Sequence, residues 1–596
     1  MIRKSVPFLV PALLLALLFA APVRAAENAL DLAPDEALAF VVVNRLAETD
    51  AKLVDLGNRL QLPLPSFLGQ IKILAKIKGG LNEQGTAVLA LMPPKEGEPI
   101  PIPIPVLFAP VTDFGAVVAA LEPDDADAPI VQVRMMDHAF VAAGKGDYAV
   151  FTEARHRDVL QQILDAPGRA RKDVAPMRSW LKRNDLAVVV TRPGVVLFST
   201  KAREGLLQAK SSLADMPEKM KKDMEAAVAV FGVYDDALEA IEKEITTYAA
   251  GMRLGKNGAL RLTDWMRVSP DGQLAKIIAE IETPEQDLLR GLPRRPFVVA
   301  GGGHLSEKTL EVMMRLSIGV IKAAPQMYGL DEQQADELAK ISTRSMQGVR
   351  GMAMMIGVGK AGDPVYNDIA FVMTVDDAQA YLARYKETIE AMNRLVEGVE
   401  RSILKGTKLT EIEVAGGPAL QVSMEVPLAP GVEEMPGYDR MMQTFFGSGG
   451  KITAFLAAAD DHTIVASYTN KRLLEQGIEV VQGTRPGLAD GRRLAAAAAM
   501  LPSGAQWVGF WSPKGTVDFI NRLIPALTPE GAPEFRLPEC PATPPIAIAA
   551  KTVPGGVRGY MVVPAAALEA VGKMIAELKQ SHIAAAAPET APAEDH

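Results

Sequence analysis

The chain has 596 residues, of which 48% are hydrophobic and 23% are charged. This is a globular composition with room for several domains, and it excludes wholesale disorder. The formal net charge of −9 argues against nucleic acid as a partner, and the single cysteine, Cys540, excludes a disulfide within the chain.

The first 25 residues have the organisation of a secretory signal peptide. Arg3 and Lys4 form a positive start, Phe8 to Ala21 form an apolar run, and small residues precede a cleavage position after Ala25. We therefore expect an exported protein, periplasmic or extracellular, with a mature charge of −12 once the leader and its three cations are removed. An uncleaved membrane anchor is the alternative, and the apolar run is shorter than the ~20 residues that a spanning helix needs.

Three recurring patterns indicate an internal duplication. Segments 140–164 and 455–479 both suggest a hairpin followed by a helix, and segments 258–282 and 555–579 both suggest a strand followed by an amphipathic helix. A third pattern is an apolar strand, a break and a helix, and it occurs at 38–60, 186–207, 297–316 and 507–523. Because the patterns recur in the same order, chance resemblance is a poor explanation.

These patterns predict an α+β fold of tandem duplicated modules, each a mainly antiparallel sheet with helices packed on one face. The first half would be 26–290 and the second 291–580, followed by a disordered tail at 581–596. The expected modules are a long one at 31–167, a short one at 175–290, a long one at 291–482 and a short one at 495–580.

Alternating prolines mark residues 98–107 (EPIPIPIPVL). In an extended strand, alternate N–H groups point to the same edge, so Pro99, Pro101, Pro103 and Pro105 would remove the donors from one edge. We expect a strand at the edge of its sheet, protected against further pairing. A polyproline recognition segment is the alternative.

Three motifs match known sites but lack the required context. Gly357 to Gly362 matches G-x-G-x-x-G, but a second strand-like run follows where a helix should begin, so we predict a hairpin turn. His156-Arg157-Asp158 matches the start of a kinase loop without its Asn, and we predict a helix start. Gly301-Gly302-Gly303-His304 could form an oxyanion loop, but the chain has no nucleophile elbow, and we predict a strand-to-helix turn.

No local metal or redox motif is found. The histidines are scattered, and we expect His138, His156 and His462 to be exposed at hairpin turns or helix starts. Other candidates are better explained by structure than by chemistry. They are the Met216, Met220 and Met224 stripe (core packing), Asp124, Asp125 and Asp127 (a solvated turn), and Cys540 (an unreactive thiol in a proline-rich loop). We therefore propose no catalytic, cofactor-binding or metal-binding residue and no cofactor.

The stretch Leu32-Ala33-Pro34-Asp35, followed by an apolar strand at 39–43 and a helix, resembles uncharacterised exported bacterial proteins with tandem α+β modules. The resemblance covers most of the mature chain. It implies export and a modular fold, and it implies no activity and no site residue.

The leading functional hypothesis is an exported, non-enzymatic binding or scaffold protein with a protein or cell-envelope partner. Repeated modules support it because they create extended surfaces and grooves. One alternative is an envelope hydrolase whose site is assembled from distant residues. The other is a carrier that holds an apolar ligand between sheet and helices.

If the leader is cleaved after Ala25, the native protein begins at Ala26. N-terminal sequencing of protein recovered from the exported fraction checks this, and the expected first residue is Ala26. Recovery of an intact Met1 from the soluble cytosolic fraction would contradict it.

Overall fold

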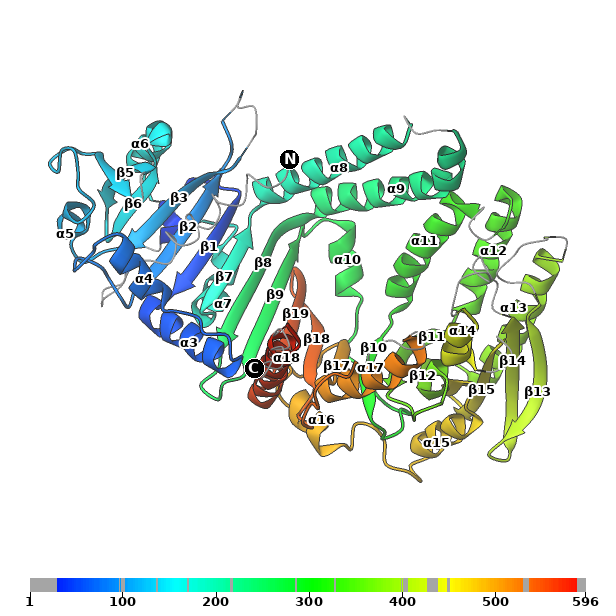
Figure 1. The fold of residues 1–596 in the computed structure, drawn as a ribbon. Helices are drawn as coiled ribbons and strands as arrows, with labels where there is room; N and C mark the ends of the chain where they lie inside the picture. Colours follow the sequence, from blue (N-terminus) through cyan, green and yellow to red (C-terminus); the bar gives the residue numbers. More distant parts are fainter. Residues whose placement is uncertain are drawn as a thin grey trace, which may run out of the picture. The chain divides into compact units, whose positions relative to one another are not determined.

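A computed structural model gives the structure of the protein (Figure 1). It describes residues 29–95, 97, 102–135, 138–168, 171–214, 218–284, 287–325, 329–397, 399, 406–425, 438–447, 451–528 and 535–586. The predicted signal peptide lies outside these ranges. The chain divides into two compact units, which we call unit 1 (1–204, 238–275 and 555–558) and unit 2 (205–237, 276–554 and 559–596).

Unit 1 contains an antiparallel sheet with the strand order β4-β5-β6-β3-β2-β1-β7-β8-β9. The strands are β1 (Ala39–Asn44), β2 (Thr86–Met92), β3 (Ile104–Pro110), β4 (Val131–Met135), β5 (His138–Lys145), β6 (Tyr148–Glu153), β7 (Leu186–Val190), β8 (Ile245–Leu254) and β9 (Leu260–Val268). Its helices are α2 (Ala29–Leu32), α3 (Leu46–Arg59), α4 (Phe67–Leu74), α5 (Phe114–Ala119), α6 (Arg157–Asp165) and α7 (Arg178–Arg183). Three further helices have residues in both units: α8 (Arg192–Ala214), α9 (Glu218–Glu244) and α10 (Gln273–Ala279).

Unit 2 contains antiparallel strands in the order β13-β14-β15-β16-β12-β11-β10-β17-β18. They are β10 (Phe297–His304), β11 (Val349–Gly357), β12 (Ile369–Val375), β13 (Lys408–Val414), β14 (Gly417–Glu425), β15 (Lys451–Asp460), β16 (Thr463–Tyr468), β17 (Trp507–Trp511) and β18 (Ile546–Val553), and most of β19 (Gly556–Val563) also belongs to this unit. The helices are α11 (Glu307–Ala323), α12 (Glu332–Ser345), α13 (Ala378–Leu395), α14 (Tyr438–Phe446), α15 (Lys471–Val481), α16 (Arg492–Ala498), α17 (Pro513–Leu527) and α18 (Ala565–Ala586). The predicted α+β class with antiparallel pairing is confirmed.

Helices cover both faces of the unit 2 sheet, so the prediction that they pack on one face is wrong. Ile464 and Val465 are neighbours in β16 and point to opposite faces. Ile464 lies in a core that includes Tyr381 of α13, whereas Val465 lies in a core that includes Leu474 of α15. Figure 1 shows α13 and α15 on opposite sides of the strands. The strand sequences require this, because consecutive apolar residues need cover on both sides.

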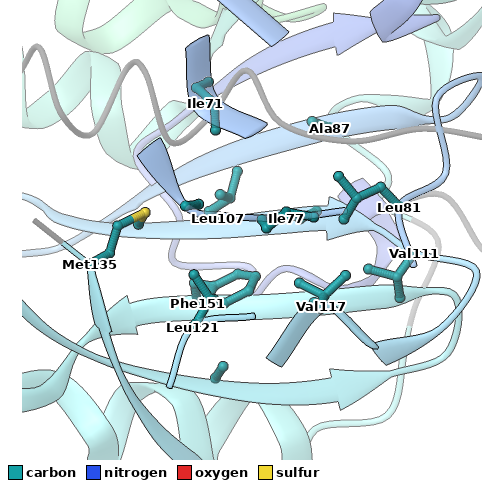
Figure 2. Packing of buried hydrophobic residues seen from close by; sticks show 14 of the residues in the cluster. Ile71, Ile77, Leu81, Ala87, Leu107, Val111, Val117, Leu121, Met135 and Phe151 are labelled. Carbon is teal, nitrogen blue, oxygen red and sulfur yellow. The ribbon is translucent and has the colours of Figure 1, made fainter. Parts of the chain in front are cut away.

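The core on one face of unit 1 is built from short helices packed on the sheet (Figure 2). Ile71 of α4 and Val117 of α5 are buried with Leu107 of β3 and Phe151 of β6. Burying a side chain of this size stabilises the fold by about 1.5–3 kcal/mol relative to leaving it exposed. The helices α4 and α5 have six to eight residues, so this packing rather than their own propensity holds them in place.

The four predicted strand–helix segments are confirmed, and their strands are interior strands, each paired on both sides. β1 pairs with β7 in unit 1, and β10 pairs with β17 in unit 2. After β7 and after β17 the chain turns sharply into a helix, and glycine follows at Gly194 and Gly515. A Cβ atom at Gly194 would overlap the Leu38 carbonyl oxygen, and one at Gly515 would overlap the Phe297 carbonyl oxygen. Each helix start therefore lies directly against the neighbouring central strand.

The proline-rich strand has one free side only at its proline end, so the sequence-based expectation of an edge strand holds for that part and not for the whole strand. β3 lies between β2 and β6, and it pairs with β6 from Leu107 to Pro110. At Ile104 and Pro105 it pairs only with β2, and the Pro105 carbonyl accepts a hydrogen bond from Thr152 Oγ1 at 2.9 Å. Proline is tolerated here because the missing donor falls where no second strand is paired. Residues 98–101 lie outside the described ranges.

Two other boundaries differ from the sequence-based expectations. The predicted tail at 581–596 begins in helix, because α18 continues to Ala586. Its last residues are alanines, which have the highest helix propensity, and residues 587–596 lie outside the described ranges. The Gly357–Gly362 motif does connect two antiparallel strands as predicted, but through a longer connection that contains a 3₁₀ helix at Val365–Asp368.

The two helix starts give a matched test of the central packing. We expect Gly194→Ala and Gly515→Ala each to lower the free energy of unfolding by about 1–3 kcal/mol, because the added methyl displaces backbone. Gly205→Ala is the control, since its α8 site has open space and alanine favours a helix. Denaturant unfolding measures all three variants. Equal stability of Gly194→Ala and Gly205→Ala would contradict the packing argument.

Candidate functional site

A cavity of about 280 Å³ lies at one end of the unit 2 sheet, where β10 and β12 end and β11 begins. Charged, polar and apolar groups from three strands and a preceding turn share its wall. The lining residues are Glu282, Thr283, Pro284, Asp287, Leu288, Arg290, Gly303, His304, Arg350, Gly351, Met352, Ala353, Val372 and Thr374.

One of the glycines inside β10 makes room for this wall. Gly301, Gly302 and Gly303 lie within the strand, so the predicted strand-to-helix turn is wrong at this position. A Cβ atom at Gly302 would overlap the carbonyl oxygen of Leu288, so the turn at 287–290 lies directly on the strand. Glycine weakens a strand interior, and close backbone approach is a physical reason to keep it.

Contacts within the turn and just after it also hold the turn at 287–290 in place. Leu289 N–H donates to Asp287 Oδ1 at 3.0 Å, and the Leu289 side chain is buried in the core beneath it. The Leu488 N–H donates to the Leu292 carbonyl at 2.8 Å and holds the following segment. The segment 287–292, which lines the cavity together with His304, is therefore held in place by hydrogen bonds and core packing.

The two arginines in the lining are bound to acids that lie outside the lining. Arg350 makes a two-pronged ion pair with Asp376, with Nε–Oδ1 at 2.7 Å and Nη2–Oδ2 at 2.9 Å. These bonds hold the pKa of Asp376 below its usual value and raise the pKa of Arg350. Arg290 Nη2 lies 2.7 Å from Asp460 Oδ2. Both pairs are largely exposed, so they orient the guanidinium groups and add little to stability.

Two carboxylates and one imidazole also line the wall. Glu282 and Asp287 are exposed, and His304 is half-buried at the end of β10 with its N–H bound to the Gln506 carbonyl at 2.8 Å. With both arginines neutralised, these carboxylates leave the cavity with a negative balance. This arrangement can bind a small molecule that offers hydrogen-bond donors or a positive charge, with Ala353 and Val372 as an apolar floor.

Two neighbouring cavities extend this charged end of unit 2. One of about 370 Å³ shares Arg350 and adds Asp376 and Arg384. The other, of about 380 Å³, shares Asp287 and Arg290. Arg350 and Arg290 therefore each line two of the three cavities.

Buried polar groups also lie at the end of β1 in unit 1. Asn44 is buried there, and its Nδ2 donates to the carbonyls of Leu181 at 2.8 Å and Asn184 at 2.9 Å. The neighbouring Asp185 has a fully buried side chain and binds Arg45 Nη2 at 2.7 Å and Lys52 Nζ at 2.8 Å. The polar side-chain groups of Asn44 and Asp185 are therefore engaged in contacts within the fold.

The other histidines do not join the cavity lining. His156 is buried at the start of α6, so the expectation that it is exposed is wrong. It packs there because the helix begins against the sheet, which confirms the helix start predicted for the 156–158 motif. His138 is exposed at the first residue of β5, directly after the β4–β5 hairpin connection, as expected. His462 is exposed at the β15–β16 turn, where its Nδ1 lies 2.7 Å from the Asp376 carbonyl oxygen.

The remaining sequence candidates have structural explanations. Cys540 is buried beside Val517 and Ala570, and burial raises the pKa of its thiol, which disfavours the reactive thiolate. The Asp124–Asp127 segment is an exposed turn. Met216 and the side chains of Met220 and Met224 lie outside the described part of the chain.

Within the described ranges, no group of three His, Cys, Asp or Glu side chains is arranged to hold a metal ion. Among the helices of those same ranges, none has the length and apolarity needed to cross a bilayer. Comparison with known protein families, with curated proteins and with solved structures gives no match.

No sequence motif marked this site. Its residues come from five segments between positions 282 and 374 that only the sheet brings together. The one available signal was the Gly-Gly-Gly-His run, because three glycines at the end of an apolar strand are unexpected in a sheet centre.

Proposed function

We propose that this protein is an exported, non-enzymatic binding protein built from two copies of one α+β unit, in which the second copy binds a small polar ligand beside His304. The export signal at 1–25 and the duplication at about 26–290 and 291–580 are parts of this proposal. The observation that carries it is the cavity beside His304 in unit 2, whereas the end of β1 in unit 1 carries the buried, hydrogen-bonded Asn44.

The strand order supports the duplication. Reading both units from the centre outward, β1 corresponds to β10, β2 to β11, β3 to β12, β6 to β16 and β5 to β15. On the other side, β7 corresponds to β17 and β8 to β18. Unit 2 adds β13 beyond β14 at the far edge. The hairpins that contain Phe140 and Phe455 occupy equivalent positions in this order.

Individual hydrogen bonds support it as well. Asn44 N–H donates to the Asp185 carbonyl at 2.9 Å, and His304 N–H donates to the Gln506 carbonyl at 2.8 Å. The side chain of Asp185 accepts from Leu254 N–H at 2.8 Å, and that of Gln506 accepts from Thr552 N–H at 2.9 Å. Asp185, just before β7, and Gln506, just before β17, thus make equivalent backbone and side-chain hydrogen bonds.

This correspondence aligns the central strands residue by residue. Val41, Val42 and Val43 of β1 correspond to Gly301, Gly302 and Gly303 of β10, and Asn44 corresponds to His304. Exchanging three strand-favouring valines for glycines lowers strand stability. Of the three glycines, Gly302 faces the turn at 287–290, where a Cβ atom would overlap the Leu288 carbonyl oxygen. We interpret Gly302 as the change that makes room for the cavity wall in the second copy.

Native mass spectrometry of the exported protein tests this function. Protein purified without denaturation should carry one small molecule that is released on unfolding, and His304→Ala should lose most of it. His138→Ala is the matched control, since it removes an exposed histidine from unit 1. A wild-type protein without any adduct, or an adduct kept equally in His304→Ala, would contradict the proposal.

A further inference from the structure

The charged groups of the polar cavity beside His304 are unequal in number. Both arginines of its lining, Arg290 and Arg350, form ion pairs with aspartates that lie outside the lining. Glu282 and Asp287 line the cavity as well. Four carboxylates are therefore grouped with two guanidinium groups, which gives the site a formal charge of −2 with His304 neutral.

The surroundings of Arg350 show the same excess of negative charge. Hydrogen bonding to Asp376 raises the pKa of Arg350, and the charges of Glu307 and Glu282 add to this rise. The neighbouring cavity that shares Arg350 has three carboxylates and two arginines in its lining. An anionic ligand would therefore meet more repulsion than attraction at this end of unit 2.

Both carboxylates of the lining keep acceptor atoms available for a ligand. Asp287 Oδ1 accepts the N–H of Leu289 at 3.0 Å, and this bond orients the carboxylate. Among the residues that the structure describes, Asp287 Oδ2 and the Glu282 carboxylate have no hydrogen-bond partner and no ion pair. An ammonium group donates three hydrogen bonds and accepts none, so it matches these oxygens and the hydroxyl groups of Thr283 and Thr374 in the same lining.

The size and the floor of the cavity favour an organic cation over a single metal ion. Its volume of about 280 Å³ is several times the ~30 Å³ that one water molecule occupies in the liquid. Ala353 and Val372 form the apolar floor. These side chains can pack against the CH₂ groups of an alkyl chain, and removing such groups from water favours binding.

We propose that this cavity binds a short aliphatic diamine, whose ammonium groups are bound by Glu282 and Asp287 and whose carbon chain packs on Ala353 and Val372. The inference rests on the ligand site proposed beside His304, and it specifies the chemistry of that ligand. Both amino groups of such a molecule are protonated at neutral pH, because an alkylamine has a pKa close to the ~10.4 of lysine. A diamine therefore offsets the formal charge of the site, whereas a monoamine would offset half of it.

Isothermal titration calorimetry of the full chain, dialysed to remove bound small molecules, tests the proposal. We expect 1,4-diaminobutane to bind saturably to one site. Butylamine has one ammonium group and should bind about tenfold more weakly. Succinate and 1,4-butanediol have carbon chains of the same length without a positive charge, and they should not bind. Raising the salt concentration should weaken the binding of the diamine, because salt screens charges near the surface.

Three variants locate the binding of the diamine. Glu282→Gln and Asp287→Asn each remove one negative charge, and each should weaken the affinity about tenfold. Asparagine at position 287 keeps an oxygen that can accept the Leu289 N–H, so the turn should stay folded. Asp271→Asn is the matched control, because it removes an exposed carboxylate that does not line the cavity, and it should leave the affinity unchanged.

The outcomes separate this inference from the function on which it rests. Unchanged affinity in both Glu282→Gln and Asp287→Asn, or binding of succinate or Ca²⁺ in place of the diamine, would overturn the inference. So would a protein that carries a small-molecule adduct in native mass spectrometry but does not bind the diamine, and in that case the ligand site beside His304 would stand. A protein that carries no adduct and binds none of the titrated compounds would contradict both.

Discussion

The packing of a helix start against a central strand is the constraint on which each unit depends. In unit 1 the chain leaves β7 at Thr191, turns at once, and brings Gly194 against the carbonyl of Leu38. In unit 2 the same turn brings Gly515 against Phe297. Because a Cβ atom fits at neither position, the distance between helix and strand is fixed by backbone contact. The central strand pair and the residues just before it are thereby held in one geometry.

On this fixed frame, small changes of sequence have local consequences. A valine at position 42 fills the space beside β1, whereas Gly302 leaves room for the turn at 287–290. A cavity with charged walls results beside the end of β10. Under the proposed duplication, one copy keeps the structural role while the other acquires a binding cavity.

The sequence predicted elements well where the signal was local. Apolar runs followed by a break and a helical pattern located the four central strand–helix segments, because strand and helix periodicities are visible within ten to twenty residues. It failed where the outcome depends on neighbours in space. The prolines before Leu107 suggested an edge strand, and β3 does lack a second partner at Pro105, but the pairing of Leu107–Pro110 with β6 was not foreseen.

The candidate site was beyond sequence reasoning for the same reason. His304, Arg350 and Thr374 are each unremarkable in their own segments, and they meet only because β10, β11 and β12 are adjacent. The glycine run was noticed but assigned to a turn, since glycine is far commoner in turns than in the centre of a sheet. Helices on both faces were missed because short strands with two buried sides resemble other apolar segments.

The equivalence of the two units is tested most directly at position 185. If Asp185 and Gln506 occupy one place in a repeated frame, glutamine at position 185 should still accept the hydrogen bond from Leu254 N–H, as Gln506 does from Thr552 N–H. Hydrogen exchange resolved to single amides measures this in Asp185→Gln and in Asp185→Leu, which removes the acceptor. The account predicts that Leu254 stays protected in the glutamine variant and exchanges faster in the leucine variant. Equally fast exchange in both variants would contradict it.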